Sequence, residues 1–303
     1  MKHLLSIESL PTSEVDAILA LSKTLKATRG QEGTPQPLRK QCWGLIFSKS
    51  STRTRVSFEV GIRELGGHVL FLSANDIQLG RGEPICDTAR VLGRMLQGAV
   101  IRTYAQSDVE DFARYGKIPT INALTDVEHP CQILADLFTL QERLGGYEGK
   151  TVTFVGDGAC NVPVSWIWAA AHLNFKLRIA APKAFQPPAD LLARVNSPNI
   201  TVTDDIREAA RGADVLYTDV WVSMGMEREA EYRLAQFGGY QINQALVDLA
   251  APGALVMHCL PAYRGKEITA DVLEAHAETI FSQAENRLHV QKAILSRLVA
   301  GKS

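Results

Sequence analysis

The segment 51–55, with the sequence S-T-R-T-R, follows the apolar stretch 43–47 and precedes the amphipathic stretch 56–65. A helix start offers unpaired backbone N–H groups and the positive end of the helix dipole. Hydroxyl groups can donate to phosphate oxygens, and a guanidinium binds phosphate through its forked donors. Ordinary helix capping beside a solvated basic turn is the alternative. Three hydroxyls interleaved with two arginines favour an anion site, but no G-x-x-x-x-G-K-[ST] sequence is present, so it is not a nucleotide P-loop.

Two further features of the first half carry candidate ligand groups. The sequence H-P-C-Q at 129–132 places a proline where the first helical residue would lie, so His129 caps the helix and Gln132 lies one turn in. Both side chains can then face a ligand, although a capping histidine more often makes a surface hydrogen bond. Arg102 ends the apolar stretch 99–102, where a lone arginine is usually structural.

The second half has three comparable features, each after a predicted strand. The sequence H-C-L-P-A-Y-R-G occupies 258–265, and D-V-W-V-S-M-G occupies 219–225. Taken alone, Asp219 could equally be a helix or turn cap, and Cys259 would be interpreted as a small buried residue. The turn G-D-G at 156–158 is half of a dinucleotide-binding fingerprint, but the third glycine is missing, so that match is weak.

The elements that position these residues alternate between strands and helices. We expect strands at 43–47, 68–72, 99–102, 151–155, 176–181, 200–203, 214–218 and 254–257, with helices at 13–28, 56–65, 130–144 and 164–172. This alternation predicts an α/β protein whose mainly parallel sheets are flanked by helices. In such sheets, ligands bind beyond the carboxyl ends of the strands.

The length of 303 residues suggests two domains. We place the boundary near 147, with domains at 1–147 and 148–303, and expect a C-terminal helix at about 284–300 to pack back on the first domain. The net charge of −1 argues against a nucleic-acid partner. Five scattered cysteines without a C-x-x-C pair argue against a zinc or redox motif and fit a reduced, cytoplasmic protein. No signal peptide or membrane span is expected.

Four segments resemble, in chain order, the motifs of the aspartate/ornithine carbamoyltransferase family: S-T-R-T-R, H-P-C-Q, D-x-x-x-S-M-G and H-C-L-P. The last two resemble the motifs of its ornithine-specific members. The resemblance covers essentially the whole chain. It implies carbamoyl phosphate binding by Ser51, Thr52, Arg53, Thr54, Gln78, Arg102, His129, Gln132, Cys259, Leu260 and Arg287. It implies ornithine binding by Asn161, Asp219, Ser223 and Met224, and catalytic roles for Arg102, His129, Gln132, Asp219, Cys259 and Arg287. At 160, this chain has cysteine where the family often has a second asparagine.

The reaction implied by the resemblance is that of carbamoyl phosphate with L-ornithine, giving L-citrulline and phosphate. The neutral δ-amine attacks the carbamoyl carbon, and phosphate leaves. No metal or organic cofactor is implied, because the leaving group is already activated. Family members supply a residue from the loop around Gln78 to a neighbouring subunit, so a homotrimer with shared active sites is implied.

Two alternatives remain open at this stage. The acceptor could be a related amine, such as N-acetylornithine, putrescine or aspartate, although the S-M-G sequence at 223–225 favours free ornithine. A non-catalytic protein on the same fold is the second alternative, which the occupied motif positions argue against.

Overall fold

The computed structural model describes residues 1–74, 77–78, 82–223 and 225–301. The chain forms two compact units. The first unit comprises Met1–Phe138 and Glu285–Ser303, and the second comprises Thr139–Ala284. Among the described residues, no helix is both long and apolar enough to span a membrane.

The first unit contains a four-stranded, fully parallel sheet in the order β2-β1-β3-β4. Its strands are β1 (Cys42–Phe47), β2 (His68–Ser73), β3 (Gly98–Arg102) and β4 (Thr120–Leu124). Its helices are α1 (Thr12–Ala27), α2 (Thr52–Glu64), α3 (Ile85–Leu92) and α4 (Gln106–Gly116). The N-terminal segment extends the sheet through a bridge from Leu4 to Ile121 of β4.

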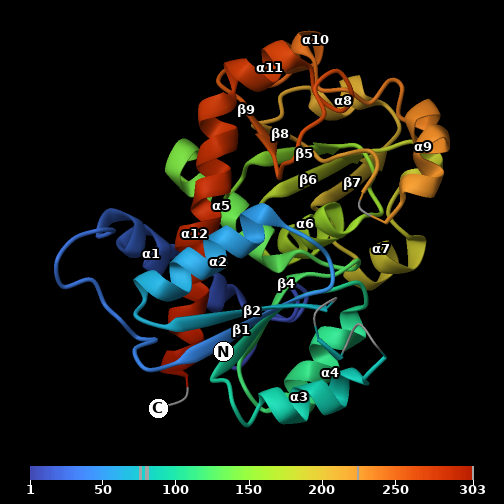
Figure 1. The fold of residues 1–303 in the computed structure, drawn as a ribbon. Helices are drawn as coiled ribbons and strands as arrows, with labels where there is room; N and C mark the ends of the chain where they lie inside the picture. The colour runs from blue at the N-terminus through green and yellow to red at the C-terminus, as the bar shows by residue number, and fades with distance from the viewer. Residues whose placement is uncertain (75–76, 79–81, 224, 302–303) are drawn as a thin grey trace. The chain divides into compact units, whose positions relative to one another are not determined.

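Helices α3 and α4 lie together on one face of this sheet (Figure 1). They share a buried cluster with β1 and β3, formed by Ile46, Ala89, Leu96, Ala99, Ile101, Val109, Phe112 and Ile118. The central strands β1 and β3 are buried along nearly their whole length, as parallel strands covered on both faces must be. This buried layer makes the carboxyl edge of the sheet a rigid support for the loops that follow it.

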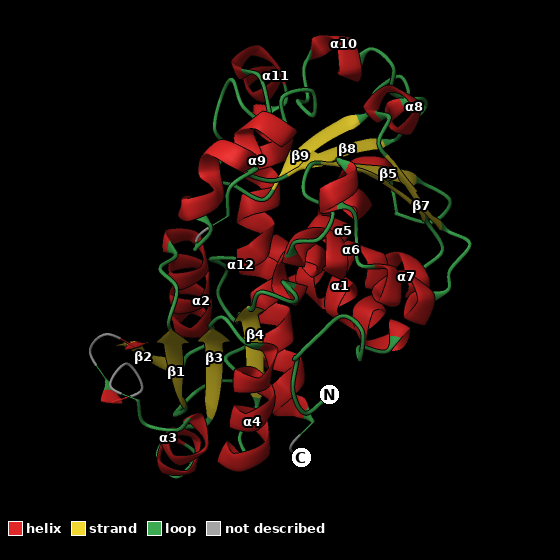
Figure 2. Cartoon of the chain, turned by 90° about the vertical axis from the view of Figure 1, so that its right-hand side faces the viewer, coloured by secondary structure: helices red, strands yellow, loops and turns green. Residues whose placement is uncertain are grey.

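The second unit contains a five-stranded parallel sheet in the order β7-β6-β5-β8-β9. The strands are β5 (Thr151–Val155), β6 (Lys176–Ala180), β7 (Ile200–Thr203), β8 (Val215–Thr218) and β9 (Leu255–His258). Around them lie α6 (Asn161–His172), α7 (Ala189–Val195), α8 (Ile206–Ala210), α9 (Ala230–Gln236), α10 (Gln244–Val247) and α11 (Ala270–Ala275), with short 3-10 turns η3 (Lys183–Phe185) and η4 (Glu227–Glu229). Figure 2 shows strands β9, β8, β5 and β7 of this sheet, with α8 and α10 on one side of them and α6 and α7 on the other.

Two long helices belong to both units: α5 (Pro130–Leu144) and α12 (Ala277–Ala300). From Glu285 onward, α12 packs within the first unit. Lys292 of α12 is fully buried and pairs with Glu64 of α2 at 2.7 Å, and Arg297 pairs with Glu14 of α1 at 3.0 Å. The predicted return of the C-terminal helix to the first unit is therefore confirmed.

The predicted α/β architecture of two parallel sheets flanked by helices is also confirmed, with differences at the ends of elements. Helix α2 begins at Thr52 and not at 56, because Ser51 caps it and the S-T-R-T-R segment forms its first turn. Helix α12 begins at Ala277, seven residues before the prediction. Strand β4 was missed, since its central residue Asn122 is polar although fully buried. Asn122 Nδ2 donates to the Leu5 carbonyl at 2.9 Å, which satisfies the nitrogen side of its amide in the interior.

Candidate active site

In the first unit, the sheet order reverses between β1 and β3, which are neighbours although β2 lies between them in sequence. A crevice at the carboxyl ends of the strands is expected at this switch point. The loop from β1 to α2 and the end of β3 meet there, and the backbone N–H of Ser48 donates to the Arg102 carbonyl at 2.8 Å. The topology therefore brings the S-T-R-T-R segment and Arg102 to the same place.

The start of α2 is held by its own side chains. Ser51 has an extended backbone, and its Oγ accepts a hydrogen bond from the backbone N–H of Thr54 at 3.2 Å. Thr52 is exposed and Arg53 is partly buried. Arg55 lies 3.7 Å from the centroid of the Phe71 ring and also pairs with Glu59. Arg55 is thus engaged along the outside of α2, whereas Thr52 and Arg53 remain accessible at the helix start.

Thr54 is the centre of a buried cluster of cationic side chains. Its Oγ1 accepts from Arg287 Nη2 at 2.6 Å and from Arg102 Nη1 at 3.5 Å. All three side chains are at least 92 % buried. A hydroxyl group can accept two hydrogen bonds and donate one. The two guanidinium groups occupy both acceptor positions of Thr54, so its O–H can donate to a ligand. The cluster therefore presents hydroxyl and guanidinium donors together, as an anionic ligand requires.

His129 lies beside these arginines at the start of α5. Burial lowers its pKa well below the ordinary histidine value, and the nearby charges of Arg287 and Arg102 lower it further. The imidazole is therefore neutral at pH 7, and a neutral imidazole keeps one N–H donor. Such a donor can bind a developing oxyanion without adding a further charge to the site.

Gln132, one turn into α5, is almost completely buried. Its Nε2 donates to Asp136 Oδ1 at 2.8 Å, which fixes the orientation of the amide. Within the part of the chain that the structure describes, its buried Oε1 has no hydrogen-bond partner. An amide N–H of a ligand is the kind of group that such an oxygen needs. Cys131, which lies between His129 and Gln132 in the sequence, has its thiol turned to β4, where it donates to the Asn122 carbonyl at 3.4 Å. Burial raises the pKa of Cys131 to about 12.

Lys49 was not identified from the sequence, yet it ties together three loops at this edge. Its side chain is 94 % buried, pairs with Asp126 after β4 and lies 4.3 Å from the centroid of the Tyr104 ring after β3. A lysine in a polar turn would ordinarily be solvated, so no local signal predicts its burial. The contact partners alone reveal that Lys49 holds the loops carrying the arginine and histidine side chains.

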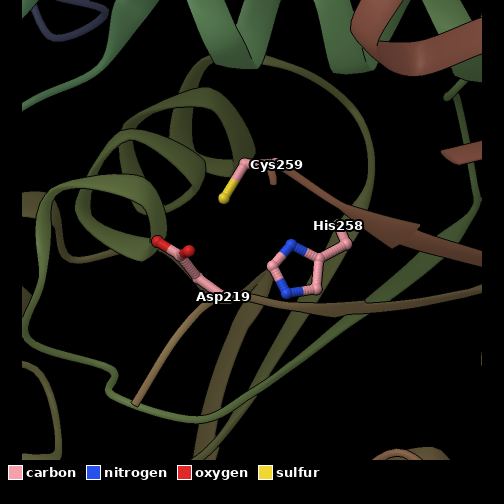
Figure 3. A group of neighbouring side chains, drawn as sticks. All are labelled: Asp219, His258 and Cys259. Atoms are coloured by element: carbon pink, nitrogen blue, oxygen red, sulfur yellow. The ribbon is translucent and has the colours of Figure 1, made fainter. Parts of the chain in front are cut away.

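In the second unit, the sheet order reverses between β5 and β8. Asp219 follows β8, and the H-C-L-P segment follows β9, the next strand. Figure 3 shows the Cys259 thiol pointing toward the Asp219 carboxylate, with the His258 ring beside them. Burial raises the pKa of the Asp219 carboxyl, while the neighbouring His258 and a hydrogen bond from Cys259 act in the opposite direction. Asp219 and Cys259 are only partly buried, so a ligand can reach them.

A hydrogen-bond chain holds the backbone of this segment. The Leu260 N–H donates to His258 Nδ1 at 2.9 Å, so Nε2 carries the proton and donates to the buried Glu267 Oε1 at 3.2 Å. Leu260 has a φ of +57°, a left-handed conformation that is uncommon for such a residue, and a cis bond joins it to Pro261. The Tyr263 N–H also donates to Glu267. Glu267, which the sequence did not single out, therefore fixes both ends of the turn.

Asp219, His258 and Cys259 have ligand atoms within 4.8 Å of one another, as a metal site would. However, His258 Nδ1 already accepts from Leu260 and its Nε2 already donates to Glu267. Two donors remain, which is fewer than the three protein ligands of an ordinary catalytic zinc site. The arrangement is therefore better suited to holding an ammonium or amine group.

The remaining predicted residues lie at the edges of these clusters. Asn161 is the first residue of α6 and is partly buried, as is Ser223. Gln78 is exposed in the first unit, and no hydrogen bond among the described residues joins its side chain to the S-T-R-T-R segment. Met224 lies outside the described residues. The structure therefore groups Thr54, Arg102, His129 and Arg287 in one unit and Asp219 with Cys259 in the other.

The weak dinucleotide alternative for G-D-G has a packing explanation. A Cβ on Gly158 would lie 2.8 Å from Ile179 Cγ2 and 3.1 Å from the Phe185 carbonyl oxygen. Asp157 is occupied by an ion pair with Arg233 at 2.6 Å. The glycine is thus required by the close approach of neighbouring loops, and no phosphate ligand is needed to account for it.

Both units are parallel α/β sheets with candidate ligand groups beyond the carboxyl ends of their strands. Residues 2–142 match the model of the aspartate/ornithine carbamoyltransferase carbamoyl-P binding domain, and residues 148–298 match that of the family's Asp/Orn binding domain. The chain therefore belongs to the aspartate/ornithine carbamoyltransferase family.

Individual relatives agree over their full lengths. An ornithine carbamoyltransferase from Akkermansia muciniphila is 57% identical over 98% of both chains, and one from Geobacter sulfurreducens is 49% identical over 99% of both. Among solved structures, the ornithine carbamoyltransferase from Pyrococcus furiosus has a TM-score of 0.91 and 42% identity, covering 99% of this chain and 97% of that one. The anabolic enzyme from Campylobacter jejuni has a TM-score of 0.93 and 38% identity over 100% of both chains.

Proposed function

We propose that this chain transfers the carbamoyl group of carbamoyl phosphate to the δ-amine of L-ornithine, giving L-citrulline and phosphate. The observation that carries the proposal is the buried Thr54–Arg102–Arg287 cluster next to a neutral His129. Such a cluster suits a doubly charged phosphate joined to a polar carbonyl group. The full-length similarity to ornithine carbamoyltransferases supports the same acceptor.

The proposed division of labour follows the two domain matches. We assign carbamoyl phosphate to residues 1–147 and ornithine to residues 148–303. Ser51, Thr52, Arg53 and Thr54 would hold the phosphate at the start of α2, where backbone N–H groups add to the side-chain donors. Gln132 Oε1 and the Leu260 carbonyl would accept from the carbamoyl NH₂ group.

The chemical step forms one bond and breaks one. The neutral δ-nitrogen attacks the carbamoyl carbon, and negative charge develops on the carbonyl oxygen. Thr54, Arg102 and His129 would donate to that oxygen. Donors aimed at a developing oxyanion are usually the largest single contribution to catalysis. The C–O bond to phosphate then breaks, and the leaving phosphate is able to take up the amine proton.

We propose that the Asp219 carboxylate binds the δ-ammonium group of ornithine before that ammonium group loses its proton. Cys259 would contact the same nitrogen. The raised pKa of the partly buried Asp219 indicates that its carboxylate lacks full solvation and would gain from a cationic partner. Asn161, Ser223 and Met224 would bind the α-amino and carboxylate groups, which distinguishes free ornithine from putrescine.

Side-by-side kinetics of four amines test the proposed acceptor. Purified protein is given carbamoyl phosphate with L-ornithine, N-acetylornithine, putrescine or L-aspartate, and the carbamoylated product is measured. We expect kcat/KM for ornithine to exceed that of each other amine by at least about 10²-fold, since unpaired polar groups in a site reject analogues strongly. A higher value for another amine would replace the acceptor, and no product with any amine would favour a non-catalytic role.

We also propose a cytoplasmic homotrimer in which Gln78 reaches a neighbouring subunit. Gln78 is exposed, and large apolar side chains are exposed elsewhere in the same unit: Val56, Leu70, Val91 and Met95. Exposed apolar residues of this kind mark association surfaces when they gather into a patch. Sedimentation at nanomolar concentration tests the proposal, because a fully active monomer would rule out shared active sites.

A further inference from the structure

Arg233 of α9 forms a buried ion pair with Asp157, the central residue of the G-D-G turn. Arg233 Nη1 lies 2.6 Å from Asp157 Oδ2, and the two side chains are only 8% and 5% exposed. Asp157 has no role in the proposed chemistry. The pair joins residues 76 positions apart in the sequence.

The same guanidinium makes three further contacts with neighbouring segments. Nη1 also donates to the Trp221 carbonyl at 3.4 Å, Nε donates to Glu229 Oε2 at 3.0 Å, and the group lies 5.0 Å from the centroid of the Phe185 ring. Asp157, Phe185 and Trp221 follow β5, β6 and β8, which are adjacent in the sheet (Figure 1). One side chain therefore connects three loops at the carboxyl edge of the second sheet.

Both ends of this connection lead to residues proposed to hold ornithine. At one end, Asp157 Oδ1 accepts from the Ala159 N–H at 3.0 Å, and the Cys160 thiol donates to the Asp157 carbonyl at 3.2 Å. These bonds fix the turn that starts α6 at Asn161. At the other end, Trp221 lies midway in sequence between Asp219 and Ser223, so its backbone position sets theirs.

Stability alone is a weak reason for such a pair. Well-packed apolar side chains can often replace a buried ion pair without loss of stability, because both charges must be removed from water. Arg233 is 94% buried and its donors point to protein oxygens, so it is placed to act through the loops and not on the substrate directly.

We propose that the Asp157–Arg233 pair is a positioning device for ornithine: it sets the distance between Asn161 and the Asp219–Ser223 segment. This inference rests on the proposed function and adds residues to the ornithine side of it. Misplacing a binding group by about 1 Å costs on the order of 10²-fold in rate or binding. The effect should fall on ornithine and leave carbamoyl phosphate binding intact.

The test uses the full-length protein with substitutions on each side of the pair. Asp157→Asn keeps Oδ1 for Ala159 but turns the other acceptor into a donor facing Arg233. Arg233→Met removes the positive charge. Arg233→Lys keeps the charge but has a single ammonium group in place of the forked guanidinium. Arg178→Met is the matched control, since Arg178 on β6 donates to the Ala209 and Arg211 carbonyls in the same unit. KM is measured for each substrate, and melting temperature is followed in parallel.

We expect Asp157→Asn and Arg233→Met to raise the KM for ornithine about 10- to 100-fold, with the KM for carbamoyl phosphate within about twofold of wild type. Arg233→Lys should recover part of the loss, and Arg178→Met should lower the melting temperature without changing the KM for ornithine. If Arg233→Met does not fold, Asp157→Asn decides the question.

Two results would overturn the inference. One is an unchanged KM for ornithine in Asp157→Asn, and the other is a parallel rise for both substrates. A wild-type protein that forms no citrulline would instead overturn the proposed function, so the two failures can be told apart.

Discussion

Replacement of Thr54 by valine removes one hydroxyl group and keeps the shape of the side chain. The Thr54 hydroxyl accepts from Arg287 at 2.6 Å and from Arg102 at 3.5 Å. Only the shorter bond has strong geometry, and a hydrogen bond to a charged group contributes about 1.5–3 kcal/mol. We therefore expect the free energy of unfolding to fall by about 2 kcal/mol, a decrease in melting temperature of roughly 4–8 °C.

The catalytic effect of Thr54→Val should be larger than the effect on stability. Loss of a single donor to a developing oxyanion typically costs about 10²–10³ in rate. The assay is initial-rate citrulline formation with both substrates varied, at a temperature well below the melting transition. Thr54→Ser keeps the hydroxyl and should stay within about tenfold of wild type.

Ser57→Ala is the matched control for this experiment. Ser57 lies on the same helix, is buried, and donates to the Thr54 carbonyl at 3.2 Å. Its loss should lower stability with little change in rate. If Thr54→Val retains kcat/KM within threefold of wild type, the hydroxyl does not contact the reacting groups and the reasoning about the cluster is wrong.

Three further predictions concern other side chains. Arg53→Ala should raise the KM for carbamoyl phosphate by about 10²-fold, because a guanidinium–phosphate contact is charge-assisted; near-normal citrulline formation would remove Arg53 from the site. Cys259→Ala should lower kcat while carbamoyl phosphate affinity stays within twofold, and equilibrium binding showing a parallel loss of both would contradict its placement beside the amine. His129 has a lowered pKa, so its imidazole stays neutral in the folded chain but takes up a proton near pH 6.5 when unfolded. Its contribution to stability is therefore present above about pH 6.5 and lost as the pH falls toward the folded value. Thermal melts from pH 7 to pH 5 should show a shallower decrease in His129→Asn than in wild type, and equal slopes would refute the assignment.

The sequence predicted those strands and helices whose residue patterns lie within a few neighbouring positions. The apolar strands and the proline at the start of α5 could be recognised because hydrophobic runs and helix-start residues act within a few positions. Strand β4 escaped notice because Asn122 interrupts its apolar pattern, and the Leu5 carbonyl that accepts from its Nδ2 lies 117 positions away in the sequence. The start of α2 was placed too late because its first turn, T-R-T-R, is polar and so lacks the apolar spacing of the rest of the helix.

The site shows the same limit. Short motifs carried the residues that we propose to face substrate, such as Thr54 and Asp219. The side chains that support them gave no such signal. Glu267 contacts His258, and Arg233 contacts Asp157, a residue far away in the sequence. In a single sequence, a charged residue that will be buried looks the same as one that will be exposed to solvent. Their partners become visible only when the strand order brings distant loops to one edge of a sheet.

One labelling experiment tests the central claim most directly. Purified protein is given carbamoyl phosphate with a ¹³C carbonyl and L-ornithine with ¹⁵N at the δ-position, and the product is examined by NMR while phosphate is measured. The account predicts a ureido carbon coupled to the δ-¹⁵N of citrulline, with one phosphate released for each citrulline. A carbamoyl group on the α-nitrogen, or phosphate release without citrulline, would contradict it.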